Sequence, residues 1–379
     1  MDINYVSKRD LLIDNIEKGL FFILSLSCAL IGFPSEMSMV ALGSYVVFLG
    51  LFSLFVFFNN GFKCKKYEAH YICIVMLFFL YSIFNSVVSY KNGYETYDWL
   101  VSMVSVFSLF ITITLIFSKL RADFIIKVVI TVSFLWTLKV MAEVLQLIPF
   151  TSLLGIRITG VVIDSVMPYP LVAAVLTLFY LCDRYKFGYL LYAWFCFFIV
   201  IVGYKAVILL VGIATLVYFF GHRVDFYKIL VLLILLSVFV WFGLYEYVIL
   251  RFNSIGGGGD VIRMNEVQEA MKLFEKSPLY GVGFGFSIPN SETAGLTKTY
   301  MHNSFVYLIT SIGLTGLILY CLVLFGTCIN NGRLNYLSLL LFLLVASSLT
   351  AASFKLFQFN YLLAVVLYIN LKRSDLHGK

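Results

Sequence analysis

The sequence predicts an all-α, polytopic integral membrane protein with about 12 transmembrane helices and one long outer loop that contains short helices. Of its 379 residues, 61% are hydrophobic and 12% are charged, whereas a soluble domain has roughly 25% charged residues. The apolar residues form runs of roughly the 20 residues that a helix needs to cross a bilayer core about 30 Å thick. Unpaired backbone amides are too costly in hydrocarbon for other shapes, so these runs indicate membrane-spanning helices.

Twelve such runs follow one another along the chain. They divide it into residues 1–249 with spans one to nine, a hydrophilic loop at 250–302, and residues 303–379 with the last three spans and a tail. The division between the seventh and eighth spans rests on a short polar hairpin at residues 203–205. The predicted spans are 19–33, 37–58, 69–88, 97–118, 122–148, 166–182, 187–203, 206–221, 227–249, 303–328, 334–354 and 357–371.

The Lys and Arg residues between the spans predict the orientation, because cytoplasmic loops retain positive charge. With the N-terminus inside, 16 of the 27 Lys and Arg residues are cytoplasmic and nine are outside, five of these in the long loop. Both termini are therefore expected in the cytoplasm. The net charge of +7 follows from this topology and gives no argument for a nucleic-acid partner. Because no small-residue cleavage site follows it, the first span is interpreted as an uncleaved anchor.

The long loop is expected to be partly ordered. The four glycines at 256–259 form a flexible joint, and Asp260 is a candidate N-cap for a helix that runs to about Lys276. Ser277-Pro278 would end that helix, because the residue before proline disfavours helical backbone. None of the seven cysteines lies in the loop, so neither a disulfide framework nor a paired metal motif is predicted.

The predicted loop helix has an apolar stripe of Val267, Ala270 and Phe274, and Arg263 lies at the edge of this packed face. Behind it comes the glycine run, residues 281–285, in which Gly alternates with Val and Phe. Its glycines permit tight turns and the close approach of a ligand. No strand and helix flank the run as a dinucleotide site requires, so a nucleotide site is rejected.

Three outer cations stand against the charge bias: Arg157 after the fifth span, Lys205 at the polar hairpin, and Arg263. A membrane-borne phosphate or pyrophosphate would explain them, because guanidinium and ammonium groups bind phosphate and offset charge on a leaving group. A single outer Arg or Lys is, however, more often a snorkelling anchor.

His302 is the histidine predicted on the outer face, and Tyr300 beside it is the aromatic residue most suspected of touching substrate. The functional interpretation of His302 is a general base, with a pKa near working pH. A capping or interfacial role is an equal alternative on residue type alone.

These residues form a pattern that resembles the O-antigen polymerase and O-antigen ligase superfamily of bacterial glycan-assembly proteins. Upstream, Arg157-Ile158-Thr159-Gly160 is similar to the family's Arg-x-x-Gly segment, and Lys205 stands where many members have the arginine of Ser-Arg-Gly. The main resemblance covers about residues 250–328: Arg263-x-x-Glu266, then Ser277-Pro278-Leu279-Tyr280-Gly281-Val282-Gly283-Phe284-Gly285, then His302-Asn303-Ser304, then Ile312-Gly313-Leu314-Thr315-Gly316-Leu317.

The resemblance implies an inverting glycosyltransfer at the periplasmic face of the bacterial inner membrane, independent of metal and without a cofactor. The donor would be an oligosaccharide linked to undecaprenyl pyrophosphate, and a chain-length regulator and a flippase of the same pathway would be partners. His302 would be the base, and Arg263 with Arg157, Lys205 and the weaker candidate Arg251 would hold the pyrophosphate. Tyr300 and Asn303 would complete the substrate site.

Three functions stay open from the sequence. A polysaccharide polymerase is favoured, because polymerases of this superfamily are numerous and divergent. A ligase that moves the finished glycan to lipid A-core is the alternative. A flippase or other transporter is disfavoured, because the chain shows no internal repeat and its polar residues concentrate on one face.

Overall fold

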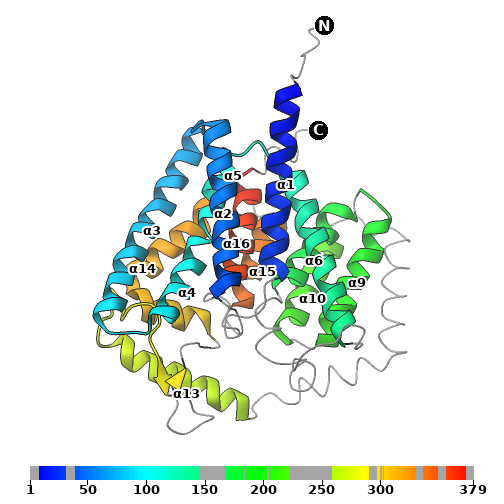
Figure 1. The fold of residues 1–379 in the computed structure, drawn as a ribbon. Coiled ribbons are helices and arrows are strands. Elements are labelled where there is room, and N and C mark those ends of the chain that lie inside the picture. The colour runs from blue at the N-terminus through cyan, green and yellow to red at the C-terminus, as the bar shows by residue number, and fades with distance from the viewer. Residues whose placement is uncertain are drawn as a thin grey trace.

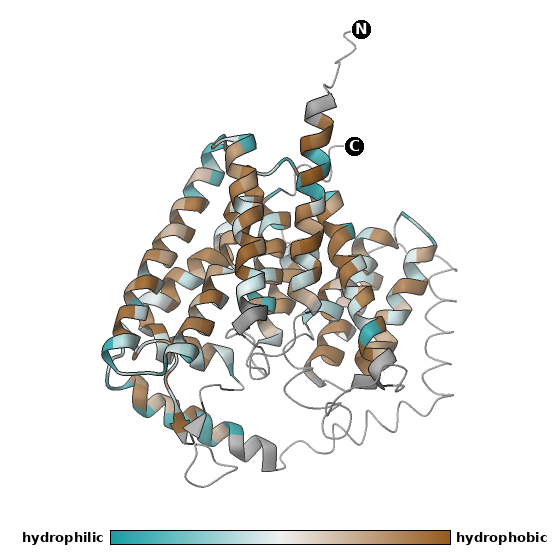
Figure 2. Cartoon of the chain, viewed as in Figure 1, coloured by the Kyte–Doolittle hydropathy of each residue, from teal (hydrophilic) through white to brown (hydrophobic). Residues whose placement is uncertain are grey.

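In a computed structural model, the protein is a bundle of helices, and the helix α13 lies across one end of it (Figure 1). The structure describes residues 8–30, 39–144, 168–182, 184–202, 205–221, 258–289, 297–298, 301, 303–329, 336–348 and 356–372. Apolar residues cover most of the upright helices, as expected of a protein whose solvent is lipid (Figure 2).

Most helices begin and end within a few residues of the predicted spans. The first helix, however, begins at Lys8, 11 residues before its predicted span, and the predicted span 97–118 is divided into two helices. Five helical stretches are long and apolar enough to cross a membrane, and five shorter ones are also apolar. The ninth predicted span, 227–249, lies outside the described residues. The helices preceding the long loop are α1 (Lys8–Leu30), α2 (Met39–Asn60), α3 (Lys66–Lys91), α4 (Thr96–Phe107), α5 (Phe110–Phe117), α6 (Ala122–Val144), α8 (Pro168–Leu176), the π-helix η1 (Thr177–Leu181), α9 (Phe187–Val202) and α10 (Lys205–Gly221).

The remaining elements are α13 (Gly258–Phe274), the strands β1 (Ile288–Pro289) and β2 (Thr297–Lys298), and the helices α14 (Ser304–Ile329), α15 (Tyr336–Ser347) and α16 (Phe357–Leu371). The sequence therefore predicts an all-α membrane protein correctly. The two strands form a minimal antiparallel pair that was not predicted. They do not create a dinucleotide site, because they follow the glycine run and pair with each other.

The helix α16 forms the centre of the bundle. All of its residues are buried, and it contacts α1, α4, α5, α6, α8, α14 and α15. A helix that is apolar around its whole circumference can be covered by lipid or by other helices, and here other helices surround it. Its few polar groups bond to neighbouring helices, as when the amide of Asn360 donates to Ser105 Oγ at 2.7 Å. Such interhelical bonds fix the register of helices that lipid alone would not order.

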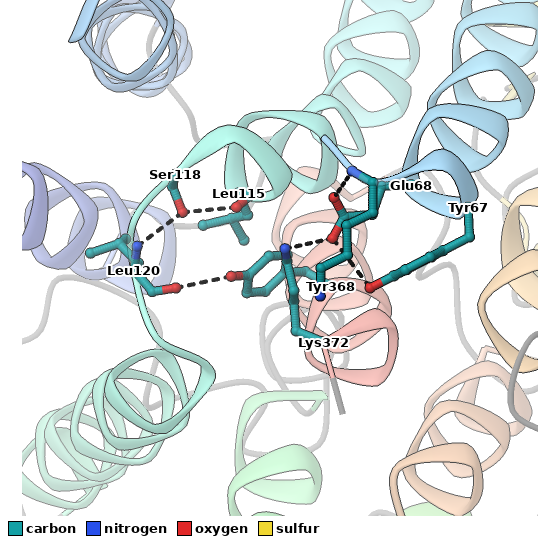
Figure 3. Close-up of polar contacts among 8 residues, drawn as sticks. Tyr67, Glu68, Leu115, Ser118, Leu120, Tyr368 and Lys372 are labelled. Atoms are coloured by element: carbon teal, nitrogen blue, oxygen red, sulfur yellow. Dashed lines mark hydrogen bonds and ion pairs between the residues drawn. The ribbon is translucent and has the colours of Figure 1, made fainter. Parts of the chain in front are cut away.

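The end of the bundle opposite α13 is fastened by polar side chains (Figure 3). Lys372, just after α16, forms an ion pair with the buried Glu68 at 2.5 Å, and Glu68 also accepts from the backbone amide of Lys65 at 2.8 Å. Tyr368 donates to the carbonyl of Leu120 at 2.9 Å. These contacts join segments that the charge pattern predicts to lie together on the cytoplasmic side.

A second fastening at this end involves Glu17 of α1. Its carboxylate accepts from the backbone amide of Lys119 at 2.9 Å and from the side-chain amide of Asn60 at 3.2 Å. Glu17 is fully buried and precedes the predicted first span, so removal of its carboxylate from water raises its pKa above the ordinary value, the largest of several effects.

Candidate functional site

The helix α13 carries the candidate site residue Arg263 across the end of the bundle that is predicted to face outward (Figure 1). It begins at Gly258, two residues before the predicted cap, so Asp260 lies inside the helix and the cap prediction is wrong. The helical backbone extends into glycines, which adopt it at an entropic cost only. The helix ends at Phe274, and turns at residues 275–280 follow it, close to the predicted end.

The buried face of α13 is centred on Glu266 and Ala270, which are 3% and 0% exposed. Val267 and Phe274 are half-buried, so the predicted stripe is correct at its middle and displaced by about one residue elsewhere. Arg263 is exposed at the edge of this face, as predicted. The buried face packs on α14, where the hydroxyl of Thr310 lies 3.4 Å from the carbonyl of Ala270.

The glycine run packs against helices. A Cβ on Gly281 would overlap the carbonyl of Ser311 in α14, and one on Gly283 would lie 2.9 Å from the Cα of Ser89 in α3. A Cβ on Gly285 would lie 2.8 Å from the backbone nitrogen of Trp99 in α4. All three glycines have positive φ, which disfavours other residues. Close approach was predicted correctly, but these contacts are made with the protein's own helices.

The run is held where α14 is broken. Gly313 has φ 65° and ψ −172°, far from helical values. In an unbroken helix the carbonyls of Thr310 and Ser311 would accept from the amides of residues 314 and 315. Here they accept from the amides of Val282 and Gly283, each at 2.9 Å.

The loop also supplies acceptors for the freed amides. The amide of Leu314 donates to the carbonyl of Pro278 at 2.9 Å, and that of Thr315 donates to the carbonyl of Leu279 at 3.1 Å. Four hydrogen bonds with the loop thus replace two bonds within the helix. Irregular backbone in a membrane protein needs such replacement, because lipid offers it no partners.

The helix α3 clamps this junction from the side. Asn85, fully buried, donates its amide to the carbonyl of Ser311 at 2.8 Å and to the carbonyl of Tyr280 at 3.1 Å. The hydroxyl of Tyr81 donates to the carbonyl of Ile312 at 2.7 Å and is hydrogen-bonded by the backbone of Gly316. This hydroxyl therefore bridges the gap where the next helical bond of α14 would be.

Sequence reasoning missed these supporting residues. A usable signal was present, because Tyr81, Asn85 and Ser89 recur every four residues and form a polar stripe in an apolar span. Polar side chains on such a stripe commonly hydrogen-bond to neighbouring helices. The adjoining turn adds Asn92, whose amide donates to the carbonyl of Val282 at 2.8 Å.

The structure describes some of the predicted site residues and not others. His302, Arg157, Arg251 and Tyr300 lie outside the described residues. Lys205 is the first residue of α10, and its side chain is not described. The convergence of these groups on one pyrophosphate is therefore untested.

Two predicted site residues lie on elements that pack together, Arg263 on α13 and Asn303 just before α14. Asn303 caps α14: its side-chain oxygen accepts from the amides of Phe305 at 3.0 Å and Val306 at 3.1 Å. The cap orients the start of the helix directly after His302, and a substrate contact of Asn303 stays a prediction.

The comparison with known families decides the wider assignment. Residues 190–321 match the family model described as O-antigen ligase. These residues belong to the O-antigen polymerase and ligase superfamily. The match contains six of the seven predicted site residues and leaves out Arg157. A comparison with curated proteins gives no match.

The residues matched to the O-antigen ligase family are supported by helices that lie outside the match. The matched range contains α13, the glycine run and the break in α14. The residues that clamp this region, Tyr81, Asn85 and Trp99, lie outside it in α3 and α4. The first spans thus support the O-antigen ligase region.

One titratable group nearby, Tyr94, has its pKa raised by partial burial, opposed by a hydrogen bond with Asn92, so it stays neutral and is no candidate base.

Proposed function

We propose that this multi-pass membrane protein is a polysaccharide polymerase. It moves a growing glycan from undecaprenyl pyrophosphate onto a sugar hydroxyl of the next lipid-linked repeat unit, at the periplasmic face of the inner membrane. The O-antigen ligase match over residues 190–321 carries the proposal, since this superfamily consists of glycosyltransferase-type enzymes that act in O-antigen assembly.

In the proposed reaction, the acceptor oxygen attacks the anomeric carbon of the donor from the face opposite the pyrophosphate. The bond between that carbon and the pyrophosphate oxygen breaks with inversion, and His302 takes the acceptor proton. Arg263, with Arg157, Lys205 and Arg251, offsets the charge that develops on the departing pyrophosphate. Each group is proposed for this role from its residue type and from the family pattern.

Two features of the fold support a rigid outer site for Arg263. Its helix α13 packs on α14 through Ala270 and Thr310, and the following glycine run is hydrogen-bonded to α14 and α3. Groups that stabilise a transition state act best when their supports hold them in place before the reaction.

The broken helix argues against the transporter alternative. Transporters use the unwound backbone of broken helices to coordinate ions and substrates. In α14 the carbonyls of Thr310 and Ser311 accept from the loop, and that of Ile312 accepts from Tyr81. These groups are committed to the fold, so the break serves to attach the loop.

The polymerase is separated from the ligase by the glycans that accumulate when the gene is deleted. We expect lipid A-core carrying at most one repeat unit, because repeat units would no longer be joined. If long, lipid-linked polymer accumulated unattached, the polymerase assignment would be wrong and the ligase assignment would stand.

The catalytic assignment is tested by His302→Ala, with polymer length measured on gels at equal protein level. We expect no polymer beyond single repeat units. The matched control is His70→Ala, because His70 is exposed near the start of α3, at the opposite end of that helix from the glycine run. Normal polymer formation by His302→Ala would remove His302 from the chemistry.

A further inference from the structure

We infer that residues 277–281 form a re-entrant corner that enters the outer leaflet, so that Leu279 and Tyr280 face the hydrocarbon chains of lipids. The segment between α13 and the glycine run was predicted as part of a hydrophilic outer loop. The inference concerns the partner of this surface and does not depend on the glycan chemistry.

The depth of the corner follows from its contacts with α3. The carbonyl of Tyr280 bonds to Asn85 and to Tyr81, which precede the end of α3 at Lys91 by six and ten residues. At 1.5 Å per residue these positions lie about 9 and 15 Å along the helix from Lys91. If Lys91 marks the membrane boundary, the corner lies well inside a hydrocarbon core about 30 Å thick.

Contacts with α14 give a similar depth. The carbonyls of Pro278 and Leu279 accept from the amides of Leu314 and Thr315, which come 10 and 11 residues after the start of α14 at Ser304. The corner therefore reaches past the kink at Gly313, beside the apolar second part of this helix.

The backbone of the corner is suited to hydrocarbon. The carbonyls of Pro278, Leu279 and Tyr280 all accept hydrogen bonds from protein groups, and the amide of Gly281 donates to the carbonyl of Ser277 at 2.8 Å. Non-helical backbone is tolerated at membrane depth when the protein satisfies it in this way. A loop exposed to water would not need partners for these carbonyls.

The exposed side chains of the corner continue the lipid-facing surface. Leu279 and Tyr280 are 55% and 53% exposed, and Phe84 of α3 is 50% exposed. The rings of Phe84 and Tyr280 meet edge to face, with centroids 6.3 Å apart. Leu314 of α14, whose amide bonds to Pro278, and Ile318 four residues further along that helix are exposed as well. These exposed apolar side chains, on two spans and the corner between them, fit the hydrocarbon chains of lipids.

Two charged residues precede the corner, at the point where the chain would enter the membrane. Glu275 and Lys276 are exposed directly after α13. The long side chain of Lys276 can extend to the headgroups while its methylenes lie against apolar surface.

Tryptophan placed at the corner tests the inference in proteoliposomes. We would compare Leu279→Trp with Phe84→Trp in the span and with Gln268→Trp on the exposed side of α13, each corrected for the four natural tryptophans. Lipids brominated in their acyl chains should quench the added emission of Leu279→Trp as strongly as that of Phe84→Trp. Aqueous iodide should quench that of Gln268→Trp severalfold more.

Two outcomes would overturn the inference. Quenching of Leu279→Trp by iodide, with none by brominated lipid, would place the corner in water. Quenching by neither, together with a dimer on size-exclusion chromatography, would show that a second copy covers the surface. Tyr280→Trp, which keeps an aromatic ring, gives the same comparison if Leu279→Trp does not fold. Because the readout is fluorescence, a wrong polymerase assignment would leave it unchanged.

Discussion

The side-chain amide of Asn85 lies 2.8 Å from the carbonyl oxygen of Ser311 and joins α3 to α14 next to the break at Gly313. The same amide holds the carbonyl of Tyr280. One buried side chain therefore connects a span, a broken helix and the loop that leads from α13. The support of the candidate site depends on residues far from it in the sequence.

Replacing Asn85 with Ala should destabilise the protein by about 1–3 kcal/mol, because two hydrogen bonds are lost and the carbonyls of Ser311 and Tyr280 each keep one other donor. Unfolding in mixed micelles with increasing denaturing detergent measures this free energy. Asn92→Ala is the control, since the exposed Asn92 holds one carbonyl, that of Val282, and otherwise bonds to the partly buried Tyr94, so its loss should cost less. Equal costs for the two variants would contradict a central role for Asn85.

Replacing Gly281 with Ala should cost at least about 2 kcal/mol, because positive φ strains an L-residue and the new Cβ overlaps the carbonyl of Ser311. Gly61 gives a matched control. It also has positive φ, but a Cβ there meets nothing within 4 Å, so Gly61→Ala isolates the backbone strain. If both variants unfold at the same detergent concentration, the glycine run does not require close packing.

Replacing Arg263 should separate the effect of its positive charge from the effect of its guanidinium geometry. We expect Arg263→Ala to abolish polymer formation and Arg263→Lys to restore only a small part of it, because lysine cannot bind pyrophosphate through two parallel hydrogen bonds. Polymer length in membranes with equal protein content is the measurement. Lys272→Ala, on the same helix and exposed beside Glu269, should leave polymer length unchanged. Full activity of Arg263→Ala would exclude Arg263 from the site.

Glu17→Gln should change the pH dependence of stability. Burial raises the pKa of Glu17, so its contribution to stability is fully present below the unfolded pKa, near 4.3, and is lost as pH rises through the folded pKa. The midpoint of thermal unfolding of the wild type should fall relative to that of Glu17→Gln over this range.

The glutamine should be accommodated at neutral pH. The amide of Lys119 can still donate to it, and Asn60 can turn its side-chain oxygen, which has no partner among the described residues, toward the new amide group. A wild type that gains stability over Glu17→Gln as pH rises would show that the hydrogen bonds outweigh burial.

Breaking the ion pair between Glu68 and Lys372 should cost about 3–5 kcal/mol, because Lys372→Met leaves a buried carboxylate without its cation. The double variant with Glu68→Gln should recover much of this loss. Thermal unfolding of the two single variants and the double variant gives the coupling free energy. Additive losses would mean that the pair contributes little to joining α3 and α16.

The sequence by itself determined the class of this protein and the position of several of its spans. Bilayer thickness fixes how many consecutive apolar residues a span needs, so spans such as 69–88 can be found without knowing their neighbours, and α3 confirms that one. The end of α13 near Ser277-Pro278 and the position of Arg263 at the edge of the packed face also follow from local patterns.

Only the tertiary structure decided what the glycine run contacts, where α14 is broken and which face of α13 is buried. These features depend on pairs such as Asn85 and Tyr280, which are 195 residues apart. Local sequence sets helix length and amphipathicity. The partner of a buried amide or of a glycine with positive φ depends on which helices pack side by side, and packing is a property of the whole bundle.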